Sequence, residues 1–153
     1  MTLWSTEISN LKLDEPITVI AKEKISVCIK KMQENQVTCI PVINGNDKLI
    51  GVFTEREFMN TYVNTNLPGE TEVSAVMRRP APSIKLSSSI QEALDTLGRE
   101  KIRVITICDD ENKVCGTLTA GNLLDYIVEF FPDDLLNLAP DSHLETSLNM
   151  DGG

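Results

Sequence analysis

The sequence predicts an α+β fold made of two pseudo-symmetric copies of one unit, and a gapless internal repeat is the main reason. Residues 8–63 align with residues 73–128 at a constant offset of 65 positions. Identities are few, but apolar positions stay apolar, as where Phe53 falls on Leu118. A unit this short buries its apolar face poorly alone, so the two copies should pack together. We therefore expect the functional site between them.

Composition and charge limit the class of protein. The 153 residues are 41% hydrophobic, enough for two small interdependent units. The formal charge of −9 argues against nucleic-acid or anionic-membrane partners, which require a basic face. Because we find neither a spanning apolar run nor a signal-peptide pattern, we expect a cytoplasmic protein. We assign residues 1–66 to an N-terminal segment with repeat 1, 67–131 to a linker with repeat 2, and 132–153 to an acidic tail expected to be disordered.

Each copy is predicted to contain a short helix, a strand, a helix, two strands and a helix. In the first copy, Ile25, Cys28, Ile29 and Met32 have the spacing of a helix with one buried face. An Asn-Gly step at Asn44 favours positive φ in the hairpin turn. The other predicted elements of this copy are the strands Pro16–Ile20, Thr38–Ile43 and Leu49–Phe53, the helix Thr54–Tyr62 and a linker at 64–71.

The second copy repeats this plan. A capping box at Ser88–Gln91 is predicted to open its first helix. The remaining predicted elements are the strands Arg103–Cys108 and Lys113–Leu118 and a closing helix Thr119–Phe131, which Pro132 ends.

The cysteines are predicted to fill the core. None of Cys28, Cys39, Cys108 and Cys115 forms a C-x-x-C pair, and the single histidine, His143, lies in the tail. Zinc sites favour closely spaced ligand pairs, so we expect no metal site. Cys108 and Cys115 flank a turn, but a disulfide between them is not expected in a reducing cytosol.

The doubled pattern resembles a known family. The segments Cys39–Ile43 and Leu49–Glu57, repeated as Val104–Cys108 and Val114–Asn122, resemble the cystathionine-β-synthase (CBS) domain, and the tandem resembles a Bateman module. The resemblance covers about residues 8–131. It implies two βαββα repeats packed sheet to sheet with two clefts between them. It also implies that AMP, ADP, ATP or S-adenosylmethionine binds there and regulates a partner protein, with no cofactor required.

The motif after the second hairpin strand has the chemistry to hold a nucleotide. Gly51 permits close backbone approach, and Thr54 and Glu57 stand at a helix start whose amides attract anions. A carboxylate at position 57 can bind ribose hydroxyls, and Arg56 can donate hydrogen bonds to a phosphate. Thr54 and Glu57 also fit a capping box, which would need no ligand, and the sequence leaves both roles open.

The second motif is expected to bind ribose and phosphate more weakly. It carries Thr119 and Asn122, with Gly121 where the first motif has its arginine. By resemblance, the base lies near Thr18, Val37, Thr38 and Ile40 in one copy and near Ser83, Ile102 and Arg103 in the other. Arg78 and Arg79 either add positive potential to one cleft or belong to a solvated linker, and we favour the linker.

An enzyme is not expected, because neither repeat contains a histidine, a catalytic triad or a P-loop. We predict a nucleotide-sensing homodimer with an unknown client protein. The dimer is expected through the helices that carry Phe58, Met59, Tyr126 and Phe130. The alternative is a ligand-free dimeric interaction module in which both motifs act as caps. A minor third possibility is a thiol redox sensor using Cys39 or Cys108.

Overall fold

The computed structural model describes residues 2–65 and 69–130, with side chains for all of these except 62–65. The predicted acidic tail, Phe131 and part of the linker lie outside these residues. Both copies contain the predicted order of elements. These are η1 (Leu3–Ser5), η2 (Ile8–Asn10), β1 (Val19–Ile20), α1 (Ile25–Asn35), β2 (Cys39–Ile43), β3 (Leu49–Thr54), α2 (Glu55–Thr65), η3 (Val73–Ala75), β4 (Ser83–Lys85), α3 (Ile90–Glu100), β5 (Val104–Cys108), β6 (Val114–Thr119) and α4 (Ala120–Phe130).

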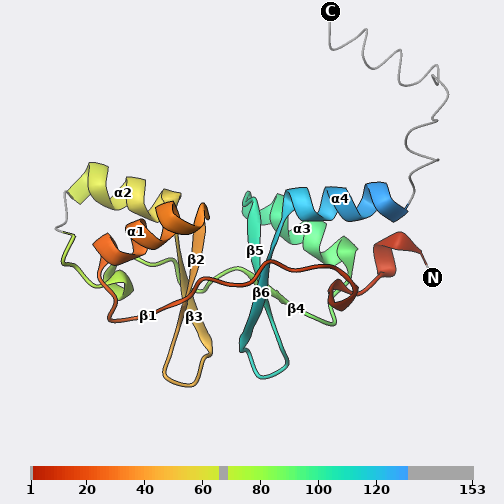
Figure 1. The fold of residues 1–153 in the computed structure, drawn as a ribbon, viewed down its shortest axis with the longest axis horizontal. Coiled ribbons are helices and arrows are strands. Elements are labelled where there is room, and N and C mark those ends of the chain that lie inside the picture. The colour runs from red at the N-terminus through yellow and green to blue at the C-terminus, as the bar shows by residue number, and fades with distance from the viewer. Residues whose placement is uncertain (1, 66–68, 131–153) are drawn as a thin grey trace, which may run out of the picture.

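Two three-stranded sheets form the centre of the molecule, in the orders β1-β2-β3 and β4-β5-β6. In each sheet the first strand is parallel to the second, and the second and third form an antiparallel hairpin. Helices cover the outer sides, and the sheets face each other at the middle (Figure 1). The predicted α+β fold of two βαββα units packed sheet to sheet is confirmed. The predicted first strand was too long, because only Val19 and Ile20 pair with β2.

Left-handed backbone positions occur at equivalent places in both copies, but not where the sequence predicted. Asp47 and Asn112 have φ of 63° and 64°, and no described glycine has positive φ, so the expected positive φ at the Asn-Gly step was wrong. Instead, the Asn44 side chain accepts from the N–H groups of Asn46 and Lys48 and so shapes the turn. Asp109 does the same in the second hairpin.

Helix ends also follow the repeat. Gln36 and Lys101 both end their helices with φ of 54°. At the start of α3, the Ser89 hydroxyl accepts from the Glu92 N–H at 3.1 Å. The capping box predicted one residue earlier, at Ser88–Gln91, was therefore wrong in register, although the helix begins where expected.

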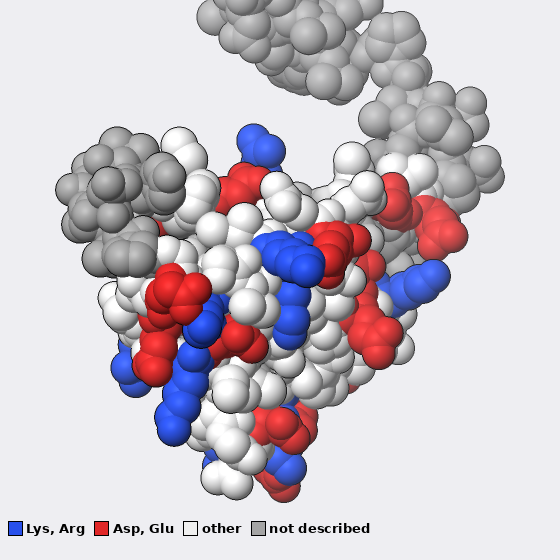
Figure 2. Space-filling view, turned by 60° about the vertical axis from the view of Figure 1, so that its left-hand side comes forward, with Lys and Arg blue, Asp and Glu red and all other residues white. Residues whose placement is uncertain are grey.

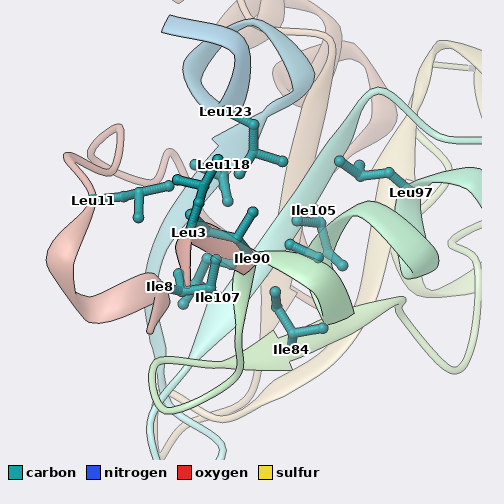
Figure 3. Close-up of a cluster of buried hydrophobic side chains, with 11 residues drawn as sticks. Leu3, Ile8, Leu11, Ile84, Ile90, Leu97, Ile105, Ile107, Leu118 and Leu123 are labelled. Atoms are coloured by element: carbon teal, nitrogen blue, oxygen red, sulfur yellow. The ribbon is translucent and has the colours of Figure 1, made fainter. Parts of the chain in front are cut away.

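The segments that precede β1 and β4 each pack on the other repeat's core. We call residues 3–18 and 69–82 the first and second entry segments. Leu3, Ile8 and Leu11 of the first join the core of the second sheet (Figure 3). Val73 and Met77 of the second join the core of the first sheet. The two repeats therefore complete each other's hydrophobic cores.

The entry segments also pair with the free edges of the sheets. Asp14 exchanges two backbone hydrogen bonds with Thr117 of β6, at 3.0 and 3.1 Å. Arg78 exchanges two with Val52 of β3, at 2.8 and 3.1 Å. Each sheet edge thus gains a partner from the opposite repeat, which satisfies backbone groups that would otherwise be unpaired.

Glycines make this edge pairing possible. A Cβ on Gly116 would lie 2.9 Å from Leu13 Cβ and 3.0 Å from the Asp14 carbonyl oxygen. A Cβ on Gly51 would lie 2.6 Å from the sulfur of Met77. The close approach at Gly51 is therefore made by the second entry segment, whereas the sequence suggested a bound ligand. The hairpins also touch, since the Leu49 N–H donates to the Asn112 carbonyl at 3.0 Å.

None of the helices in the described ranges is long and apolar enough to cross a membrane. Residues 2–65 and 69–130 bring together no group of three or more side chains of the kinds that hold metal ions.

Candidate functional site

The first cleft is a cavity of about 210 Å³ between the two repeats. Its walls come from β2, β3 and the start of α2 in the first repeat, and from the end of α3 and from β5 in the second. The second entry segment closes one side through Arg78 and Pro82. The other lining residues are Thr38, Cys39, Val52, Thr54, Glu55, Arg56, Glu57, Lys101, Ile102, Arg103, Val104 and Thr106.

Thr54 and Glu57 meet at the start of α2. Glu57 is only 8% exposed, and the Thr54 hydroxyl oxygen lies 3.0 and 2.9 Å from its two carboxylate oxygens. That hydroxyl also accepts from the Arg56 N–H at 3.2 Å. Thr54 therefore caps the helix while it holds the carboxylate beside the cavity. The carboxylate oxygens retain acceptor capacity for a ligand hydroxyl.

Four basic side chains surround this cavity, each from a different part of the fold. Arg56 lies in the first turn of α2, Lys101 is the C-cap of α3, and Arg103 directly precedes β5. Arg78 comes from the second entry segment and forms an ion pair with Glu100, with Nη2 and Oε2 2.5 Å apart. The Arg56 guanidinium donates to the Lys101 carbonyl at 3.4 Å. The cavity is thus equipped for an anionic ligand.

The second cleft occupies the repeat-related position and has a volume of about 360 Å³. Asp14 and Glu15 supply its charged side chains, and none of its described lining residues is Lys, Arg or His. The remaining lining residues are Ile17, Asn35, Gln36, Val37, Thr38, Cys39, Val104, Thr117 and Thr119. This cavity therefore lacks the positive side chains that would attract phosphate.

The motif beside the second cleft forms a closed capping box. Asn122 Oδ1 accepts from the Thr119 N–H at 3.1 Å and from its hydroxyl at 2.7 Å, and the Asn122 N–H donates back to that hydroxyl at 2.9 Å. Both side chains are thus engaged with the helix start. Asn122 does not line the second cavity.

The residues predicted for ligand binding are divided among several places. Ile40 is fully buried in the core and Ser83 pairs with Thr106 in the sheet, and neither lines either cleft. Thr18 and Asn122 line neither cleft. The first cleft contains Thr38, Thr54, Arg56, Glu57, Ile102 and Arg103, and the second contains Val37, Thr38 and Thr119.

Two basic residues of the first cleft were missed or misjudged. Lys101 was not predicted, and Arg78, interpreted as part of a solvated linker, lines the cavity and is only partly exposed. The signal for Arg78 was present in the Arg78-Arg79 pair. The signal for Lys101 was its position directly before Ile102 and Arg103, both of which were predicted.

The cysteines are free thiols, and three of the four are buried as predicted. Cys115 is exposed, so the core assignment was wrong for this residue, which faces outward from β6. Burial raises the pKa of Cys39 to about 12, and the nearby Glu57 carboxylate adds to this effect. Burial likewise raises the pKa of Cys108 to about 11. Because a redox sensor needs an accessible thiolate, these values argue against that function for either cysteine.

A family model for the CBS domain matches the chain twice, at residues 8–64 and 73–129. The chain belongs to the CBS domain family. An uncharacterized protein of Methanocaldococcus jannaschii is 26% identical over 128 residues, which are 84% of this chain and 42% of that protein. Inosine-5′-monophosphate dehydrogenase of the same organism is 26% identical over 112 residues, which are 73% of this chain and 22% of the enzyme. This CBS pair therefore spans less than half the length of either relative.

Three solved structures share the fold of this chain. CBSX2 in complex with AMP is 20% identical, with a TM-score of 0.71, and the match covers 81% of this chain and 97% of that one. The CBS domain pair of MJ0100 in complex with 5′-methylthioadenosine and S-adenosyl-L-methionine is 16% identical, with a TM-score of 0.70 and coverage of 80% and 95%. An uncharacterized conserved protein from Pyrococcus horikoshii is 22% identical, with a TM-score of 0.71 and coverage of 83% and 95%.

Proposed function

We propose that this CBS pair is a regulatory module that senses an adenosine nucleotide (AMP, ADP or ATP) or S-adenosylmethionine and signals to a partner protein. The observation that carries the proposal is the first cleft, where a buried carboxylate, a helix N-terminus and basic side chains from both repeats converge. CBS pairs in complex with AMP and with S-adenosyl-L-methionine support an adenosine compound as the ligand.

Each part of such a ligand has a matching group in the first cleft. Ile102 and Val104 offer apolar surface to an adenine ring. Glu57 accepts from ribose hydroxyls, oriented by Thr54. Arg56 and the positive end of the α2 dipole attract the phosphate. Because these groups come from both repeats, a bound nucleotide would stabilise one arrangement of the repeats over others.

The signal is proposed to leave through α2 and α4. Among their described side chains, the large exposed apolar residues are Met59 in α2 and Leu124, Val128 and Phe130 in α4. The two helices lie along the same side of the molecule (Figure 1). We propose that this surface forms the homodimer. Phe58 and Tyr126, which were also predicted to contribute, are partly buried against the two cores. Since α2 begins at the ligand and carries Met59, ligand binding can alter the dimer.

We further propose a cytoplasmic, non-catalytic role without a nucleic-acid partner. The face seen in Figure 2 carries basic and acidic side chains beside one another, without the continuous basic area that nucleic acid requires. The proposal requires no metal or other cofactor.

One observation favours the alternative, a ligand-free module, for half of the molecule. The closed box of Thr119 and Asn122 satisfies its own hydrogen bonds. We therefore propose that ligand binding is confined to the first cleft, while the second motif serves as a cap.

Calorimetric titration with AMP, ADP, ATP and S-adenosylmethionine tests the proposal directly. We expect one site per chain, and a melting shift equivalent to about 2.7 kcal/mol at a ligand concentration a hundredfold above Kd. Glu57→Gln should weaken binding because glutamine is a poorer ribose acceptor, yet it remains compatible with capping. If none of the four compounds binds or shifts melting, the ligand-free alternative replaces the sensor.

A further inference from the structure

We infer that the first cleft selects adenosine polyphosphates over the monophosphate, and that Arg78 and Lys101 bind the additional phosphates. Glu100 competes with these phosphates for Arg78. This inference rests on the proposed nucleotide-binding function and names the ligand class of the same site. It concerns groups that lie outside the Thr54–Glu57 motif.

The charge of the lining residues supports a highly anionic ligand. Four lining residues are basic and two, Glu55 and Glu57, are acidic. This excess of positive charge occurs in a protein whose formal net charge is −9. Each added phosphate brings further negative charge and acceptor oxygens, which suit guanidinium and ammonium donors. The sulfonium cation of S-adenosylmethionine would gain nothing from these groups.

The position of Arg78 is fixed by its backbone. Its N–H and carbonyl both pair with Val52, so the side chain starts from the edge of β3, two residues before Thr54. The guanidinium forms its ion pair with Glu100 at the end of α3, and both side chains are 31% exposed. A ligand phosphate in the cavity would offer Arg78 a second anionic partner. Because the Arg78 side chain is partly buried, water would weaken this attraction less than at the open surface.

The end of α3 holds two arginines in this structure. Glu100 binds Arg78 through its carboxylate, and the Lys101 carbonyl accepts from Arg56. Both contacts therefore join the first repeat's side of the cleft, where Arg78 pairs with β3 and Arg56 lies in α2, to the end of α3 in the second repeat. A polyphosphate would exchange these contacts for its own, so binding is coupled to the packing between the repeats. Loss of the Glu100 charge should therefore strengthen polyphosphate binding.

Lys101→Gln is the most informative variant, because the first repeat already carries glutamine at the equivalent C-cap. Gln36 occupies the equivalent position in the first repeat, with the same φ of 54°. Glutamine is therefore compatible with this left-handed C-cap. Lys30→Gln provides the matched control, since Lys30 lies on α1, is highly exposed and lines neither cleft, while its loss changes the net charge equally.

The experiment is calorimetric titration of adenosine, AMP, ADP, ATP and inorganic tripolyphosphate into the wild type and the variants, at low and moderate salt. We expect ATP to bind at least about tenfold more tightly than AMP, with a steeper loss of affinity in salt. Lys101→Gln and Arg78→Gln should reduce the ATP-to-AMP ratio several-fold. Glu100→Gln should increase it, and Lys30→Gln should leave it unchanged.

The outcomes separate this inference from the proposed function. If AMP binds as tightly as ATP, or if Lys101→Gln leaves the ratio unchanged, polyphosphate selection is overturned while nucleotide binding stands. If tripolyphosphate binds as well as ATP, the cleft is a simple anion site and the inference fails. If no adenosine compound binds, the proposed function itself fails.

Discussion

The first and second clefts occupy equivalent places in one repeated scaffold, yet their charges are opposite. Arg56, Lys101 and Arg103 of the first cleft correspond to Gly121, Gln36 and Thr38. The fourth basic residue, Arg78, pairs with the edge of β3 as Asp14 pairs with the edge of β6. The backbone is retained in both copies, including the left-handed positions 36 and 101. Repetition therefore preserved the fold while side chains at the cavity walls diverged.

The two motifs differ in the same way. In the second, Asn122 and Thr119 satisfy each other, whereas in the first Glu57 places a buried carboxylate beside the cavity. Equal spacing of threonine and its partner thus supports a cap in one copy and a candidate ligand site in the other. The following variants test this division between the halves.

Truncation of a core residue in either entry segment should have the largest effect on stability. Ile8→Ala should lower the free energy of unfolding by about 2–5 kcal/mol, because Ile8 is fully buried in the core of the second sheet. Val73→Ala, the equivalent change on the first sheet, should cost less because fewer atoms are removed. Urea denaturation measures both costs. Hydrogen exchange should show Ile8→Ala loosening α3 more than α1, and the reverse order would contradict the crossed packing.

The next effect compares the two motifs. Arg56→Ala should weaken ATP binding by about 1.5–3 kcal/mol and adenosine binding much less, because a charge-assisted phosphate contact is lost. Asn122→Ala should leave ATP affinity nearly unchanged but lower stability by about 0.5–2 kcal/mol through loss of its cap contacts. Calorimetry and thermal melting together measure these effects. Abolition of binding by Asn122→Ala alone would place the ligand at the second motif.

The smallest effect compares the two glycines under the entry segments. Gly116→Ala should destabilise the protein by about 1–3 kcal/mol, since the new Cβ meets a backbone carbonyl and the Cβ of Leu13. Gly51→Ala should cost less, because its two nearest neighbours belong to the flexible Met77 side chain. Chemical denaturation of the two variants gives the comparison. Equal costs would show that the two crossings are equally tight, and reversed costs would show that the crossing at Gly51 is the tighter one.

The two-repeat architecture and the order of its elements could be predicted from the amino-acid sequence alone. Helix and strand periods are local, so the apolar face from Ile25 to Met32 could be recognised without its neighbours. The placement of Thr54 and Glu57 at the start of α2 followed from the same local pattern. Local signals were less exact about caps and turns, where several neighbouring residues can supply the same hydrogen bond.

Contacts between distant segments determine which segments complete each sheet and which charges line each cleft. The exposed edges of β3 and β6 accept any extended segment with free N–H and carbonyl groups, and the sequence does not specify which one. Crossing of the entry segments brought Arg78 to the first cleft and Asp14 to the second. The electrostatic difference between the clefts therefore depends on contacts between residues far apart in the chain, which no local pattern records.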